Sequence, residues 1–146
     1  ATGRAGRKER PGRALLQTYA PEHAVMQALK AQDRDAFVAA EMAERELAGL
    51  PPFGRLAAVI ASGPDAAQLD DFLRKMAEAA PNSPGVAVYG PADAPLGLIR
   101  GRRRKRFLVR ADRGVDLSAY MAAWRARVRP PGQIRVAIDI DPYSFL

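Results

Sequence analysis

Cysteine is absent from the 146-residue chain, and histidine occurs once, as His23. Without cysteine the chain can form neither disulfide bonds nor thiolate metal sites, and one histidine excludes a metal site built from several histidines. The same scarcity leaves almost no material for Ser-His or Cys-His nucleophilic catalysis. No apolar run approaches the length of a membrane span. Composition therefore favours a binding function over a self-contained metal or nucleophilic enzyme.

Positive charge is plentiful and unevenly distributed. The net charge is +7, from 23 Lys and Arg against 16 Asp and Glu. Residues 1–13 contribute +4 and residues 100–113 contribute +7, which leaves −4 for the rest of the chain. Two concentrated basic segments on a mildly acidic body predict two anion sites and make a polyanion the leading partner. The chain begins with Ala1 rather than methionine, and we expect it to be a piece of a longer protein.

The apolar pattern and the turn residues predict an α+β protein. Residues 14–19 are typical of a short strand, and helices are expected over 21–31 and 33–48. From residue 54 the expected order is β-α-β-β-α-β, with residues 90–95 as a loop. Two such split units predict a ferredoxin-like domain, in which a mostly antiparallel sheet lies under two helices. The elements predicted there are a strand at 55–62, a helix at 66–80, strands at 86–89 and 98–110, a helix after Asp116 and a strand at 134–140.

The first basic segment contains Gly3-Arg4-Ala5-Gly6-Arg7. Glycine allows the backbone to approach a phosphate closely, and arginine offers a planar fork that matches its oxygens. By itself the pattern also fits a flexible basic terminus or a nonspecific nucleic-acid arm.

The second basic segment falls on the strand predicted at 98–110. Alternation along a strand places Arg102, Arg104, Arg106 and Arg110 on one face and Arg103, Lys105 and Phe107 on the other. Because a sheet cannot bury two basic faces at one end, this end must project as a hairpin or lie against phosphates. The alternative is a solvated ribbon whose arginines pair with the acidic body. We favour DNA contact through Arg100, Arg102, Arg103, Arg104, Lys105, Arg106 and Arg110.

Three further features carry little functional weight. His23 follows Pro-Glu at a helix start and is expected to cap or pack. Asp139 and Asp141 share a face of the last strand and could suggest a cation-binding or general-acid pair, but no third ligand is evident and salt bridges are expected. Trp124, with Tyr120 and Met121, has the helical spacing of core residues.

Four separated stretches resemble the PriA-type replication-restart helicases of bacteria. They are GRAGRKERPGRALLQTYAPEH (3–23), AERELAGLPPF (43–53), GPADAPLGLIRGR (90–102) and VAIDIDPYSFL (136–146). The resemblance implies that residues 1–20 end the second RecA-like helicase lobe, that 21–50 form a helical connector, and that 51–146 form a DNA- and partner-binding C-terminal domain similar to a ribosomal S-ten-type fold.

The resemblance also implies an ATP-dependent 3′–5′ DNA helicase. Arg4 and Arg7, with Gly3 and Gly6, would approach the transferring phosphate of ATP. The sequence lacks a G-x-x-x-x-G-K-[ST] loop, so this chain alone should be inactive. ATP and magnesium are expected in the full-length protein and zinc in its upstream module, with no cofactor or metal site in this chain.

The partners implied are forked and single-stranded DNA, single-stranded DNA-binding protein and other primosome proteins, in the cytoplasm and without a membrane. Arg113 and Ser118 map near the contacts of the acidic tail of single-stranded DNA-binding protein. Arg103 and Lys105 stand where the family interleaves aromatic residues, which leaves more of the binding to backbone charge. The alternative function is a stand-alone RNA-binding module of ribosomal type. If the chain is instead part of a helicase, we expect residues 1–20 to be exposed.

Overall fold

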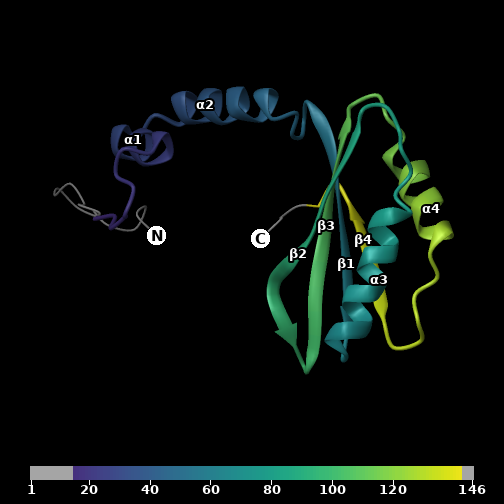
Figure 1. Cartoon of the computed structure of the whole chain (residues 1–146). Coiled ribbons are helices and arrows are strands. Elements are labelled where there is room, and N and C mark those ends of the chain that lie inside the picture. The colour runs from purple at the N-terminus through teal and green to yellow at the C-terminus, as the bar shows by residue number, and fades with distance from the viewer. Residues whose placement is uncertain (1–14, 143–146) are drawn as a thin grey trace, which may run out of the picture. The chain divides into compact units, whose positions relative to one another are not determined.

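The computed structural model describes residues 15–142, which contain four helices and four strands (Figure 1). The chain divides into two compact units, Ala1–Met42 and Ala43–Leu146. Among residues 15–142 no helix combines the length and the apolar content needed to cross a bilayer. The elements are α1 (Ala24–Ala31), α2 (Arg34–Leu47), β1 (Gly54–Gly63), α3 (Ala66–Glu78), β2 (Val86–Ile99), β3 (Arg102–Asp112), α4 (Leu117–Arg127) and β4 (Arg135–Ile140).

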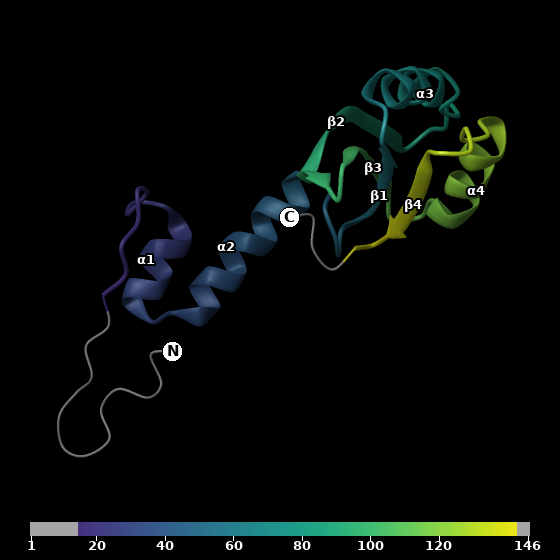
Figure 2. The same cartoon turned by 90° about the horizontal axis from the view of Figure 1, so that it is seen from below.

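The second unit has the predicted ferredoxin-like arrangement. Its strands lie in the order β2-β3-β1-β4, and each neighbouring pair is antiparallel. Helix α3 packs on β1 and β2, and α4 packs on β1 and β4. Both helices cover the same face of the sheet (Figures 1 and 2). Strands β2 and β4 are the two edges.

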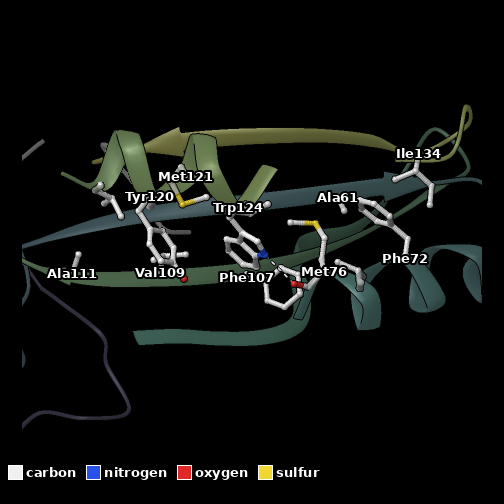
Figure 3. Packing of buried hydrophobic residues seen from close by; sticks show 14 of the residues in the cluster. Ala61, Phe72, Met76, Phe107, Val109, Ala111, Tyr120, Met121, Trp124 and Ile134 are labelled. Atoms are coloured by element: carbon white, nitrogen blue, oxygen red, sulfur yellow. Dashed lines mark hydrogen bonds between the residues drawn. The ribbon is translucent and has the colours of Figure 1, made fainter. Parts of the chain in front are cut away.

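The core lies between this sheet and its two helices (Figure 3). Val59 and Phe107, which are paired across β1 and β3, are fully buried and point toward the helices. Trp124 of α4 is also fully buried and meets the ring of Phe107 edge-on at a centroid distance of 5.4 Å. Tyr120 and Met121 are buried beside it. The prediction that these α4 side chains are core residues is confirmed.

Three side chains of α4 bind carbonyl oxygens at and beyond the C-terminal end of α3. The indole Nε1 of Trp124 donates to the carbonyl of Met76 at 2.9 Å (Figure 3). The Tyr120 hydroxyl donates to the carbonyl of Pro81 at 3.0 Å, and Arg127 donates to that of Ala79 at 3.2 Å. Because the last carbonyls of a helix lack partners within it, these bonds tie the two helices together.

Polar side chains cap the helices where the sequence predicts. Asp33 accepts from the backbone N–H of residue 36 at 2.9 Å, and Asp116 accepts from that of residue 119 at 2.9 Å. Asp65 does the same at the start of α3. The Nδ1 atom of His23 accepts from the N–H of Val25 at 3.3 Å, so the expected capping role of His23 is confirmed. Helix α1 begins at residue 24, later than the predicted residue 21.

The single strand predicted at 98–110 is wrong, because the chain turns back at Arg100-Gly101. Leu98 and Ile99 are the end of β2, and Ile99 pairs with Arg102 at the start of β3. The predicted loop at 90–95 is also wrong, since β2 continues through it with two register shifts. Between Tyr89↔Leu108 and Ala92↔Arg106, β2 advances three residues while β3 advances two. Such bulges disguise a strand because they break its alternation.

The strand predicted at 14–19 is not present in its described part. Residues 15–20 adopt no regular strand or helix, and Leu15 and Tyr19 are fully exposed. A strand needs a neighbour that accepts its ladder of hydrogen bonds, and no strand among residues 15–142 pairs with this segment. The exposure expected of the segment is confirmed for residues 15–20, and Ala14 lies outside the described residues.

Candidate nucleic-acid interface

Strand β3 carries most of the second basic segment, and its two faces have different surroundings. Phe107 and Val109 are buried under the helices, and Lys105 lies on the same face. The Nζ atom of Lys105 forms an ion pair with Asp70 of α3 at 2.6 Å. Arg104 alternates with these residues and faces away from the helices. The expected pairing of basic residues with the acidic body is thus found at Lys105.

The β2–β3 turn exposes two further cations. Arg100 has a φ of 49° and Gly101 a φ of 74°, so both central residues of the turn adopt the left-handed conformation that tight hairpins use. Arg100 is exposed within this turn, and Arg103 is exposed on β3 just after it. Figure 1 shows the hairpin end where β2 bends away from β3 and then rejoins it. We call residues 94–104 the hairpin tip.

Arg102 is half-buried in the hairpin tip. Its Nη2 atom donates to the carbonyl of Ser62 at 2.8 Å and to that of Gln133 at 2.6 Å. Its Nε atom is buried and has no hydrogen-bond partner among residues 15–142. Arg102 therefore joins the hairpin tip to β1 and to the loop before β4.

Arg104 holds the bulged part of β2. Its Nη1 atom donates to the carbonyl of Pro95 at 3.1 Å and to that of Leu96 at 3.5 Å. Carbonyl acceptors orient a guanidinium group but carry no net charge, so they leave its positive charge uncompensated. Arg102 and Arg104 thus stabilise the hairpin tip and still add to its positive potential.

Arg110 and Arg106 lie further along β3, on the face away from the helices. The Nη1 atom of Arg110 donates to the carbonyl of Ala48 at 2.9 Å, just after α2, and its side chain lies over Gly49. Arg110 therefore stabilises a helix C-terminal end, as cations commonly do. Arg106 pairs with Ile60 of β1 and is half-buried. The assignment of both residues to DNA stays a prediction.

Ser118 and Arg113 fall at the start of α4 and are both exposed. Ser118 lines a shallow groove of about 580 Å³ between α4 and β4, whereas Arg113 lies in the preceding turn and does not line it. Arg125 was not predicted from the sequence; it lies two helical turns after Ser118 and lines the same groove. The i, i+7 spacing on one helix was the signal that could have identified it. The other lining residues are Met121, Ala122, Ala126, Ile138 and Ile140.

The cation-binding role considered for Asp139 and Asp141 does not fit the structure, because an arginine already binds the carboxylate of Asp141. Asp141, just past β4, accepts from the Nε and Nη2 atoms of Arg55 at 3.2 and 2.7 Å and from the N–H of Leu56 at 3.2 Å. The Arg55 hydrogen bonds hold the pKa of Asp141 below its usual value. The expected salt bridge is confirmed for Asp141. No cluster of three His, Cys, Asp or Glu side chains suited to a metal ion occurs within 15–142.

The candidate phosphate-binding residues of the first basic segment, Arg4 and Arg7 with Gly3 and Gly6, lie outside the described residues.

Comparison with known proteins identifies related sequences. The family model of the primosomal protein N C-terminal domain matches residues 46–143. The chain is 36% identical over 143 residues to the replication restart protein PriA of Rickettsia felis, covering 98% of this chain and 22% of the relative. It is 31% identical to the protein of that name from Synechocystis and 29% to that from Bacillus subtilis, covering 99% of this chain and 17% and 19% of those relatives. The chain spans about a fifth of the length of these relatives.

Proposed function

Because the chain belongs to the family of the primosomal protein N C-terminal domain, we propose that it binds forked and single-stranded DNA as the C-terminal part of a replication-restart helicase. The matched residues include all four strands of the sheet and therefore the whole basic hairpin. The curated relatives that match the chain are named replication restart proteins. We also propose that the longer protein, of which this chain is a part, is a helicase that acts at forks and binds replisome partners.

The observation that carries the proposal is the charge of the hairpin tip. Arg100 and Arg103 are exposed, and Arg102 and Arg104 are held by neutral carbonyls. Adjacent positive charges repel one another, and a polyanion relieves several of them together. Bound phosphates would displace counterions, which gives an affinity that falls as salt is added.

Arg102 and Arg104, which are already hydrogen-bonded to backbone carbonyls, also lower the conformational entropy cost of binding DNA. A free arginine side chain loses about 2 kcal/mol of rotamer entropy when it is fixed in one geometry. Arg102 and Arg104 are already fixed by bonds to the carbonyls of Ser62 and Pro95. Lys105 contributes less in this proposal, because Asp70 already compensates its charge. The interface is therefore centred on the end of the hairpin rather than spread evenly along β3.

ATP, magnesium and zinc belong to other parts of the longer protein in this proposal. The chain has no G-x-x-x-x-G-K-[ST] sequence, and the described residues offer no three-ligand metal cluster. Residues 15–142 therefore do not by themselves fit a metal site, and we assign no step of ATP hydrolysis to this chain. Arg4 and Arg7 would add their guanidinium groups to a site completed elsewhere.

We assign partner binding to the groove between α4 and β4. Ser118 and Arg125 provide polar contacts beside an apolar lining from β4 that includes Ile138. An acidic peptide with apolar residues, such as the tail of single-stranded DNA-binding protein, has the chemistry that this lining complements. Arg113, exposed in the turn before α4, would add positive charge near the start of that helix. If the tail binds here, Arg113→Ala weakens its binding and does not change DNA affinity, as fluorescence anisotropy of a labelled tail peptide can measure.

Fluorescence anisotropy with a labelled fork tests the DNA-binding proposal. Arg100→Gln combined with Arg103→Gln removes two exposed charges and keeps the hydrogen bonds from Arg102 and Arg104 to backbone carbonyls. We expect a lower affinity for forked and single-stranded DNA. The matched control removes two exposed arginines elsewhere, as Arg34→Gln with Arg129→Gln, and should retain most of the affinity.

Equal losses in the two double variants would show that net charge, not the hairpin, sets the affinity. A single-stranded RNA of the same sequence separates the alternative function, which requires tighter binding of RNA than of DNA. The family match gives that alternative no support.

A further inference from the structure

The hairpin tip exposes apolar side chains beside its arginines. Leu96 is 76% exposed and Leu98 is 66% exposed, and Ile99 is exposed to a smaller extent. We call these three residues the apolar edge. They precede Arg100 in sequence, and Leu98 is paired directly with Arg103 across the hairpin. The three residues lie within four consecutive positions at the end of the hairpin, and neighbouring exposed apolar groups commonly mark a binding surface.

The backbone at Leu96 is held in an unusual conformation. Its φ of 54° lies in the left-handed region, which a leucine rarely adopts because its Cβ crowds the backbone there. Such a conformation persists only where the surrounding structure fixes it. The bonds from Arg104 to the carbonyls of Pro95 and Leu96 provide that support. Leu96 is thus presented to solvent on a constrained segment.

The edge of β2 is poorly suited to pairing with a strand of another molecule. Its two register shifts interrupt the straight ladder that an added strand requires. Pro91 and Pro95 remove two N–H donors from the same stretch. A second copy of the chain is therefore poorly placed to extend the sheet along residues 90–99, which favours the side chains of the apolar edge as the binding groups there.

We propose that the apolar edge contacts the exposed base faces where duplex DNA opens into single strands, while Arg100 and Arg103 bind the flanking phosphates. The inference rests on the proposed DNA binding and adds the DNA feature that this site selects. A junction offers an apolar base plane directly beside phosphates, which matches leucines beside guanidinium groups. Leucine and isoleucine are among the side chains that proteins insert between bases. Uniform single strands offer the phosphates without a terminal base pair.

The test uses a variant that removes apolar surface and keeps every charge. Leu96→Asn is tolerated in the left-handed conformation, and Leu98→Thr suits a strand. The probes are a fork with 2-aminopurine at the junction base pair and a single strand of the same length. We expect fork affinity to fall by about tenfold or more, because the variant loses the partial burial of two leucines against the bases, with single-strand affinity and salt dependence unchanged. The 2-aminopurine fluorescence should rise with the unmodified chain and stay low with the variant.

A matched control replaces an exposed leucine elsewhere, as Leu47→Gln in α2, where the side chain is 90% exposed. Equal loss of fork and single-strand affinity in the hairpin variant, or an unchanged 2-aminopurine signal with the unmodified chain, would overturn the inference but leave DNA binding intact. Failure of the unmodified chain to bind any DNA would overturn the proposed function itself. If the hairpin variant lost binding to anionic vesicles but kept its fork affinity, the apolar edge would bind a membrane surface instead, and the inference would be overturned.

Discussion

Replacement of Trp124 by phenylalanine removes a hydrogen bond on which the pairing of the two helices depends. The indole Nε1 donates to the carbonyl of Met76 at 2.9 Å, in a fully buried position. Phenylalanine keeps an aromatic ring against Phe107 but cannot donate. The carbonyl of Met76 is one of the last four of α3 and has no helical successor to bind it.

The expected cost has two parts. A buried carbonyl left without a donor costs about 1–3 kcal/mol. The smaller ring leaves a void in the core, which adds about 1 kcal/mol. We therefore expect Trp124→Phe to lower the free energy of unfolding by about 3 kcal/mol.

Urea unfolding followed by far-UV circular dichroism measures this change. Tryptophan fluorescence cannot be used, because the variant lacks the only tryptophan in the sequence. The midpoint should fall while the slope of the transition stays constant. Tyr120→Phe is the comparison: it removes the hydroxyl bonded to the carbonyl of Pro81 and should cost about 1 kcal/mol. A loss below about 0.5 kcal/mol for Trp124→Phe would refute the reasoning, because surface substitutions change stability by that amount. DNA affinity of the folded variant should not change.

Three further perturbations test the fold around the interface. Asp116→Ala removes the cap of α4 and should cost about 1 kcal/mol in thermal unfolding, whereas Asp116→Asn should restore most of it. Gly54→Ala places a Cβ in a steric clash with the carbonyl oxygen of Gly49, so we expect a strong loss of stability in the same assay. Arg55→Gln should raise the pKa of Asp141 toward its ordinary value of 3.8 in a carboxyl NMR titration. Because the folded pKa is depressed, the ion pair contributes stability above pH 3.8 and loses it as the pH falls through the lower folded value; an unshifted pKa in the unmodified chain would contradict this.

The order of elements in the second unit could be predicted from sequence because local signals agree with the tertiary structure. Asp65 and Asp116 mark helix starts, and Trp124 and its neighbours have helical spacing. The β2–β3 turn was missed because Arg100-Gly101 lacks the Asn-Gly or Asp-Gly pattern that announces such a turn. The bulges of β2 removed the alternation by which strands are recognised, so residues 90–95 resembled a loop.

The candidate interface was predictable only in part. Alternation placed Lys105 and Arg104 on opposite faces, as the structure shows. The partners of these residues were not predictable, since Asp70 lies 35 positions before Lys105 and the carbonyl of Ser62 lies 40 before Arg102. Every residue has a backbone carbonyl, so the sequence does not show which carbonyls accept hydrogen bonds from arginine. Only the folded chain therefore shows which arginines are hydrogen-bonded to carbonyls and which are exposed.

The salt dependence of single-strand binding tests the central claim most directly. The dissociation constant is measured by anisotropy across a salt series for the unmodified chain and for the Arg100→Gln, Arg103→Gln variant. Two lost phosphate contacts should reduce the slope of log affinity against log salt by about 1.4. A slope that stays unchanged, with unchanged affinity, would show that DNA does not bind at the hairpin tip.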